Sequence, residues 1–170
     1  PAAVLTALLG YALFLGERLT PRAESGVLRV EARARQWQWD FFYPDAPNAP
    51  GTPDILHIPA GQPVDIHVTS ADVIHAYWVP AFWNKIDAVP GRLNETWFKA
   101  ERPGVYFGPC TELCGARHAY MPIAIEVVPP ARFAAWVASK GGTMPNAQPR
   151  RPDQTRDSPL TAPQSPQPGT

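Results

Sequence analysis

The stretch LRVEARARQWQWDFF, residues 28–42, decides the fold class of this chain. From Leu28 to Arg35 apolar and charged side chains alternate strictly, which is the period of a half-buried β-strand. The apolar phase then moves from even to odd positions, beginning at Trp37. Because a shift of one residue turns every side chain to the opposite face of a strand, we expect a β-bulge or a strand break near Arg35 and Gln36.

Short segments with strand-like patterns follow along the chain, separated by proline and glycine turns. We expect strands over residues 55–58, 64–69, 76–79, 94–99, 105–107 and 123–128. Several short strands at this spacing predict an all-β fold, a β-sandwich or barrel. A short helix should close the domain: it begins at Pro130, is stopped by Gly141 and Gly142, and has Phe133, Trp136 and Val137 on one face.

The two ends of the chain differ in composition from this β-rich region. Residues 1–16 carry no charge, and we expect residues 1–19 to be the C-terminal part of a transmembrane helix, since a full crossing takes about 20 apolar residues. A signal-peptide core is the alternative, although no basic leader precedes it. We expect residues 20–26 to be a stalk, residues 27–142 the folded domain, and residues 143–170 a disordered, proline-rich tail.

The charges of the chain balance, with 15 Lys and Arg against 15 Asp and Glu, so the composition gives no argument for a nucleic-acid partner. Residues 36–84 contain no Lys or Arg but hold five aspartates: Asp40, Asp45, Asp54, Asp65 and Asp72. This segment either presents an acidic face to a basic partner, through an attraction that salt weakens, or is an ordinary solvated surface.

The segment CTELCGARHAYM, residues 110–121, contains both cysteines of the chain, followed by a histidine and a methionine. Its spacing is Cys110-x3-Cys114-x3-His118-x2-Met121. A disulfide would close a very small ring and leave His118 and Met121 without a role, and zinc has no use for a thioether. Copper accepts thiolate, imidazole and thioether, the donor set of a cupredoxin-type electron-transfer site that also uses a distant histidine.

His75 is the candidate for that distant histidine, because it lies at a junction between a turn and a strand in SADVIHAYWVP. His57 and His67 lie inside predicted strands, and we expect both to be structural. A mononuclear blue-copper site needs one cysteine, so Cys110 requires a further explanation.

Four segments together resemble subunit II of cytochrome c oxidase of the haem-copper type. They are CTELCGARHAYMP, SADVIHAYWVP, NKIDAVPGRLNETWF and RQWQWDFFYPD, and the resemblance runs from residue 10 to about residue 140. It implies a cupredoxin-like copper A domain in which Cys110 and Cys114 bridge two copper ions. The other ligands that it implies are His75 and His118 through imidazole, Met121 through a weak thioether bond, and Glu112 through its backbone carbonyl.

The resemblance also implies two roles outside the copper ligands. The side chain of Glu112 would bind Mg²⁺ at the contact with subunit I, since a hard ion takes oxygen ligands; an exposed loop acid is the alternative. Trp37 would accept electrons from reduced cytochrome c, whereas strand alternation alone would place it in the core on the same side as Trp39. No C-x-x-C-H segment occurs, so no covalent haem is expected in this chain.

The function implied by the resemblance is the electron-accepting subunit of a terminal cytochrome c oxidase. It would receive electrons from cytochrome c at copper A and pass them to haem in subunit I, for oxygen reduction coupled to proton translocation. The implied partners are subunits I and III and a membrane, with the copper domain on the periplasmic side of a bacterial plasma membrane. The alternatives are the copper A domain of a nitrous oxide reductase-like enzyme, a copper-free quinol oxidase subunit II, which the retained ligand residues disfavour, and a copper-delivery or storage module.

Overall fold

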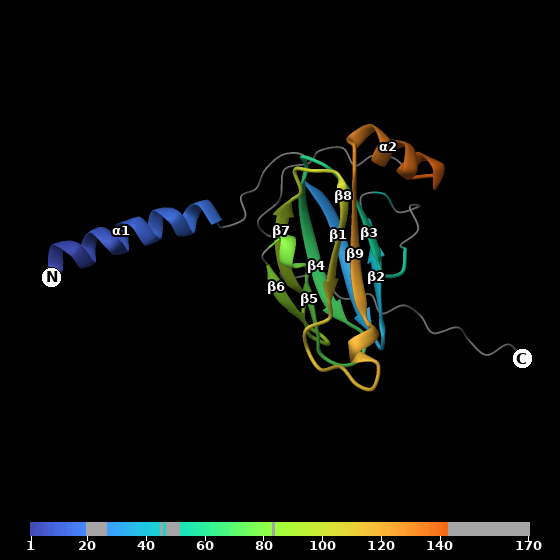
Figure 1. Cartoon of the computed structure of the whole chain (residues 1–170), viewed down its shortest axis with the longest axis horizontal. Coiled ribbons are helices and arrows are strands. Elements are labelled where there is room, and N and C mark those ends of the chain that lie inside the picture. Colours follow the sequence, from blue (N-terminus) through green and yellow to red (C-terminus); the bar gives the residue numbers. More distant parts are fainter. Residues whose placement is uncertain (20–26, 45, 47–51, 83, 143–170) are drawn as a thin grey trace, which may run out of the picture.

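The computed structural model describes residues 1–19, 27–44, 46, 52–82 and 84–142 (Figure 1). Helix α1 (Ala2–Leu19) precedes the strands and helix α2 (Pro130–Ser139) follows them. The strands are β1 (Leu28–Arg35), β2 (Gln38–Phe42), β3 (Ile55–Pro59), β4 (Pro63–Ser70), β5 (His75–Trp78), β6 (Lys85–Ala88), β7 (Asn94–Lys99), β8 (Gly104–Pro109) and β9 (Pro122–Val128). Two short 3₁₀ helices, η1 (Pro80–Phe82) and η2 (His118–Tyr120), lie between strands.

Three sheets are formed by the strands of the described residues. A four-stranded sheet has the order β2-β1-β4-β7, a three-stranded sheet has the order β3-β9-β8, and β5 pairs with β6. The pairs β1/β4 and β3/β9 are parallel and the other pairs are antiparallel. The predicted all-β class is confirmed.

The core lies between the two larger sheets, which face each other (Figure 1). Alternate residues of each strand point into it, as the period-2 patterns of the sequence predict. The four-stranded sheet contributes Val30, Ala32, Ile66, Val68, Trp39 and Phe41, and the three-stranded sheet contributes Leu56, Ile58, Ile123 and Ile125; all of them have no solvent-exposed surface. Because this core is close-packed, the sandwich is rigid, and the loops that connect its strands can hold fixed positions.

The change of apolar phase after Arg35 marks a hairpin. Strands β1 and β2 are antiparallel, with Ala34 opposite Trp39, and Gln36 and Trp37 form the turn between them. Directly opposite residues point to the same face, so even positions of β1 lie beside odd positions of β2. The predicted strand break is confirmed, and Trp37 lies in the turn rather than in a strand beside Trp39.

Two further outcomes concern helix α2 and strand β6. Helix α2 begins at Pro130 as predicted, and it buries Phe133 and Val137, with Trp136 partly buried against the core. Strand β6 was not predicted from the sequence, because its residues KIDA bury only Ala88 and show no clear alternation.

Helix α1 exposes its apolar side chains, with Leu5, Leu9 and Leu13 between 61% and 64% exposed. No helix among the described residues is long and apolar enough to cross a membrane. That residues 1–19 end a transmembrane helix therefore stays a prediction. The predicted stalk, residues 20–26, and the predicted tail, residues 143–170, lie outside the described residues.

Candidate metal centre

The loop between β8 and β9 carries most of the candidate ligands. It begins after Pro109 and ends before Pro122, two residues that lie opposite each other in the β8/β9 ladder. Its base is closed by the backbone N–H of Cys110, which donates to the carbonyl of Met121 at 3.0 Å. The loop is therefore a hairpin connection anchored on two paired strands, and its residues can hold fixed positions.

The remaining candidate, His75, comes from a different part of the chain and is tied to the same loop. It is the first residue of β5, and the carbonyl of the next residue, Ala76, accepts a hydrogen bond of 3.3 Å from the N–H of Thr111. This backbone contact places the imidazole beside the loop although 35 residues separate His75 from Cys110.

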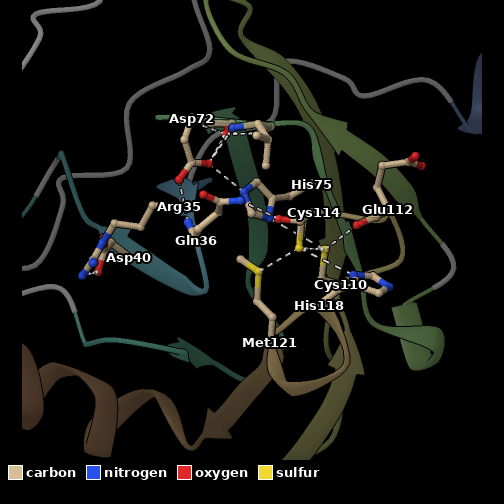
Figure 2. A network of polar contacts seen from close by, with 12 residues as sticks. Arg35, Gln36, Asp40, Asp72, His75, Cys110, Glu112, Cys114, His118 and Met121 are labelled. Atoms are coloured by element: carbon tan, nitrogen blue, oxygen red, sulfur yellow. Dashed lines mark hydrogen bonds and ion pairs between the residues drawn. The ribbon is translucent and has the colours of Figure 1, made fainter. Parts of the chain in front are cut away.

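All six predicted ligand positions converge on one cluster (Figure 2). The two sulfur atoms of Cys110 and Cys114 lie 3.9 Å apart. Around Cys110 Sγ lie His75 Nδ1 at 3.9 Å and the carbonyl oxygen of Glu112 at 3.4 Å. Around Cys114 Sγ lie His118 Nδ1 at 3.5 Å and Met121 Sδ at 3.9 Å. The donors thus lie on both sides of the sulfur pair.

The cluster is shielded from water on its inner side. His75, Cys110, Cys114 and Met121 are each at most 3% exposed. Trp39, fully buried, lies edge-on to the His75 ring with centroids 6.2 Å apart. An apolar, close-packed wall of this kind restricts side-chain movement and excludes solvent from the donors.

Both cysteines are free thiols rather than a disulfide. Burial, and after it the neighbouring Cys110, raise the pKa of the Cys114 thiol from 9.0 to about 11. The metal-free chain therefore holds Cys114 as a thiol at neutral pH, and a metal ion that binds there displaces its proton.

The backbone carbonyl and the side-chain carboxylate of Glu112 lie in different environments. Its carbonyl oxygen faces Cys110 Sγ inside the cluster, whereas its residue is exposed and its carboxylate points away from the sulfur atoms (Figure 2). The backbone and the side chain of Glu112 can thus serve different ligands.

Trp37 lies at the tip of the β1/β2 hairpin, next to the loop of residues 110–121, which we call the copper loop after the resemblance. A Cβ atom added to Gly115, the residue after Cys114, would lie 3.2 Å from Trp37 Cζ2, so the indole ring covers this glycine. Trp37 is half-buried, whereas Trp39 is fully buried. The structure brings Trp37 to the site, as the resemblance predicts, and gives the two tryptophans different environments.

Asp72 is part of the site, and the sequence reading did not single it out. Its Oδ1 lies 2.9 Å from His75 Nε2, and its Oδ2 accepts the N–H of Gln36 at 2.6 Å (Figure 2). Burial acts to raise the pKa of Asp72, but hydrogen bonds from His75, Gln36 and the N–H of Val73 lower it below 3.8. The signal in the sequence is its position three residues before His75 in a turn.

The other two histidines lie away from this cluster. His57 Nδ1 lies 3.0 Å from a carboxylate oxygen of Glu126. His67 Nε2 lies 3.4 Å from Asp65 and 3.9 Å from Glu95, and these three ligand atoms are also within 4.8 Å of one another on the outer face of the four-stranded sheet. Contacts with carboxylates account for both imidazoles, and their structural roles stay a prediction.

The four aspartates of residues 36–84 that the structure describes do not form one acidic face. Asp65 is buried. Asp40 is in an ion pair, and Asp54 and Asp72 each accept a hydrogen bond from a backbone N–H group. Asp45 lies outside the described residues. Most of these carboxylates therefore support local structure rather than a shared docking surface.

Comparison with known proteins identifies the family of this chain. Residues 49–128 match the family "Cytochrome C oxidase subunit II, periplasmic domain". The crystal structure of the periplasmic domain of subunit II of cytochrome oxidase of Bradyrhizobium japonicum is similar with a TM-score of 0.64 and 42% identity, over 71% of this chain and 96% of that chain. This chain belongs to the cytochrome c oxidase subunit II family.

Two more similar proteins show how much of a subunit II this chain covers. A probable cytochrome c oxidase subunit 2 of Rickettsia conorii is 41% identical over 140 residues, 71% of this chain and 44% of the relative. A chain in the cryo-EM structure of a heme-copper terminal oxidase dimer is similar with a TM-score of 0.52 and 28% identity, over 75% of this chain and 95% of that chain. The chain spans 44% to 59% of the length of the curated relatives it matches.

Membership of the subunit II family confirms the resemblance found in the sequence, and with it the cupredoxin-like fold. The ligand assignments to individual residues remain predictions, which the distances around Cys110 and Cys114 support.

Proposed function

We propose that this chain is the electron-accepting part of a terminal cytochrome c oxidase. Electrons from cytochrome c would arrive at a dinuclear copper A centre and pass to haem in subunit I, where oxygen is reduced and protons are translocated. The observation that carries this proposal is the convergence of two free thiols, two imidazoles, a thioether and a carbonyl oxygen on one cluster, buried on its inner side, of a subunit II fold. Copper is the metal that uses all of these donors.

The arrangement of the donors favours two ions over one. A single ion bound by four ligands needs donor atoms within about 4.6 Å of one another, twice a metal–sulfur bond of about 2.3 Å. The ligand atoms of His75, Cys110 and Cys114 lie within 4.8 Å of one another, close to this limit, and His118, whose Nδ1 lies 3.5 Å from Cys114 Sγ, is not part of that group. Two copper ions would therefore be held by Cys110 and Cys114 together with His75, His118, Met121 and the backbone carbonyl of Glu112.

The protein contributes rigidity and exclusion of water. A bound pair of copper ions supplies one-electron redox chemistry. The ligand side chains are fixed between β5, β8 and β9, so they move little when the charge of the site changes. The burial of His75, Cys110, Cys114 and Met121 also disfavours a copper-delivery function, because metal transfer requires ligands that a partner can reach.

Two residues next to the cluster would have roles of their own. We assign the exposed carboxylate of Glu112 to Mg²⁺ at the contact with subunit I, since it is a hard oxygen donor that the copper site does not use. We assign Trp37 to the uptake of electrons from cytochrome c, because its half-buried indole lies on Gly115, directly after Cys114.

The partners follow from the same proposal. The domain would lie on the periplasmic side of a bacterial plasma membrane, associated with subunits I and III, and residues 1–19 would contribute to the membrane anchor. The nitrous oxide reductase-like alternative has no specific support in the described residues.

Electron paramagnetic resonance with a copper count tests the proposal. The chain, with both thiols reduced before copper is added, is expected to bind two copper ions. In the mixed-valence Cu(I)/Cu(II) state it should show hyperfine splitting by two equivalent copper nuclei. His118→Asn should remove this signal, whereas the matched variant His57→Asn, which changes a histidine paired with Glu126, should keep it. One copper per chain with mononuclear splitting in the wild-type protein would refute the dinuclear centre.

A further inference from the structure

The turn between β1 and β2 is bonded to both ligand-bearing segments of the metal centre (Figure 2). The backbone N–H of Gln36 donates to Asp72 Oδ2 at 2.6 Å, and Asp72 Oδ1 in turn lies 2.9 Å from His75 Nε2. The side-chain amide of the same residue donates from Nε2 to the carbonyl oxygen of Cys114 at 2.8 Å. Gln36 thus contacts the segment of His75 with its backbone and the segment of Cys114 with its side chain.

The next residue, Trp37, depends on this turn for its position. Its indole Nε1 is buried and has no hydrogen-bond partner among the described residues, so the ring is not fixed by a polar contact of its own. Its position follows from packing against Gly115, at which a Cβ atom would lie 2.9 Å from Gln36 Nε2 and 3.2 Å from Trp37 Cζ2. Amide and indole therefore lie side by side on the same glycine.

These contacts have a direct consequence for the ring. The peptide N–H of Gln36 remains whatever side chain is present, so its bond to Asp72 does not depend on the amino acid. The bond from the amide to the Cys114 carbonyl is the only one of the two that a substitution removes. This hydrogen bond joins Gln36 to Cys114, the residues directly before Trp37 and Gly115. It therefore sets the distance between the Trp37 ring and the loop.

We propose that Gln36 is a positioning residue for electron uptake, which holds the Trp37 indole against the copper loop through its hydrogen bond to the Cys114 carbonyl. The inference rests on the proposed function, in which Trp37 accepts electrons from cytochrome c. The amide of Gln36 donates to a backbone carbonyl rather than to a ligand side chain, so Gln36 acts through the position of Trp37.

Gln36→Met tests this role, because methionine keeps the length of the side chain and removes its hydrogen-bond donor. The matched control is Gln38→Met, two residues further on, where the amide contacts Asp40 instead of the copper loop. A hydrogen bond of ordinary net strength shifts a population by about 2- to 10-fold. Copper reduction by saturating reduced cytochrome c should slow by that factor in Gln36→Met and remain unchanged in Gln38→Met.

Two further measurements separate positioning from general damage. The copper paramagnetic resonance signal of Gln36→Met is expected to match the wild type. In the metal-free chain labelled with 5-fluorotryptophan, the ¹⁹F resonance of Trp37, identified by its loss in Trp37→Phe, should shift or split in Gln36→Met and remain unchanged in Gln38→Met.

The outcomes distinguish this inference from the proposed function. A Gln36→Met chain that is reduced as fast as the wild type, or that has an unshifted Trp37 resonance, would overturn the role of Gln36. An altered copper signal in Gln36→Met would also overturn it, since the residue would then support the copper loop itself. Failure of the wild type to form a dinuclear centre would refute the proposed function, while the ¹⁹F comparison would still decide whether Gln36 holds Trp37.

Discussion

His75 Nε2 lies 2.9 Å from Asp72 Oδ1, on the opposite side of the imidazole from Nδ1, which lies 3.9 Å from Cys110 Sγ. A carboxylate in this position favours the tautomer with the proton on Nε2, so that the lone pair of Nδ1 faces the cluster. Asp72 is held in turn by the N–H groups of Gln36 and Val73. The orientation of a completely buried ring is therefore set by a residue outside the donor set.

Asp72→Asn is expected to weaken copper binding by about 10- to 100-fold, the usual effect of removing a carboxylate behind a metal-binding histidine. Copper affinity can be measured by competition with a chelator. The matched variant Asp87→Asn changes an exposed residue of β6 and should bind copper as the wild type does. Equal affinities of the two variants would show that Asp72 does not orient His75.

The raised pKa of Cys114 predicts how the stability of the metal-free chain changes with pH. The thiol has a pKa of about 11 in the folded chain, mainly through burial, against 9.0 ordinarily. Its contribution is fully present below pH 9 and is lost as pH rises towards 11, because the unfolded chain then loses the proton first. Two pKa units correspond to on the order of 2–3 kcal/mol in the free energy of unfolding.

Urea denaturation of the reduced, metal-free chain between pH 8 and pH 11 measures this loss. Cys114→Ser should show a smaller decrease over the same range. Burial also raises the pKa of Tyr43 and Tyr77, but their contribution is common to both chains and cancels in the difference. Parallel curves for wild type and variant would contradict the assignment of the loss to Cys114.

Much of the fold was predictable because it depends on local periodicity. The alternation in Leu28–Arg35 and in residues 64–69 predicted strands that bury the expected apolar residues, although Asp65 on the polar side of β4 is buried as well. The hairpin at Gln36 was predicted only as an irregularity, since a phase change has the same pattern whether the strand bulges or turns back. Strand β6 was not predicted because it pairs with β5 alone and buries only Ala88, so its sequence shows little periodicity.

The candidate site divides in the same way. Cys110, Cys114, His118 and Met121 were predictable because their donor atoms and close spacing indicate one kind of chemistry. Asp72 and Gln36 were not, since their roles depend on contacts over 36 and 78 residues of sequence and partly on a backbone N–H that every residue but proline carries. Supporting residues of this kind become visible only when the segments are placed together.

A substitution of Gly108 tests how closely the backbones of β8 and β5 approach each other. A Cβ atom there would overlap the carbonyl oxygen of Trp78 and lie 2.9 Å from Val79 Cα, both backbone atoms that cannot rotate away. Gly108→Ala is therefore expected to reduce the free energy of unfolding by about 3 kcal/mol, the upper range for overpacking. Phe107→Ala, at a neighbouring residue that is 69% exposed, should cost about 0.5 kcal/mol or less in the same denaturation experiment. Similar values for both would indicate a loose contact at this position.

Glu112→Gln separates the backbone of this residue from its side chain. The carbonyl near Cys110 Sγ is unchanged by the substitution, so the copper content and the dinuclear resonance signal should be those of the wild type. In the oxidase assembled from cells grown with manganese, the Mn²⁺ signal of the proposed magnesium site should be lost. Glu101→Gln, an exposed acid paired with Lys99, should retain both signals. Loss of copper from Glu112→Gln would show that the carboxylate belongs to the copper site.

Trp37→Phe addresses the route by which electrons reach the cluster. Phenylalanine keeps an aromatic ring in the turn and much of the packing on Gly115, so the copper signal should be unchanged. Reduction by saturating reduced cytochrome c, followed by stopped-flow absorbance, should slow by about tenfold or more, a barrier change of about 1.4 kcal/mol. Trp136→Phe, in helix α2 and packed against Tyr43 and His57 away from the cluster, controls for loss of an indole elsewhere. If Trp37→Phe instead lost copper, the indole would be part of the support of the site; if both variants were reduced at the wild-type rate, electrons would reach the copper ions without Trp37.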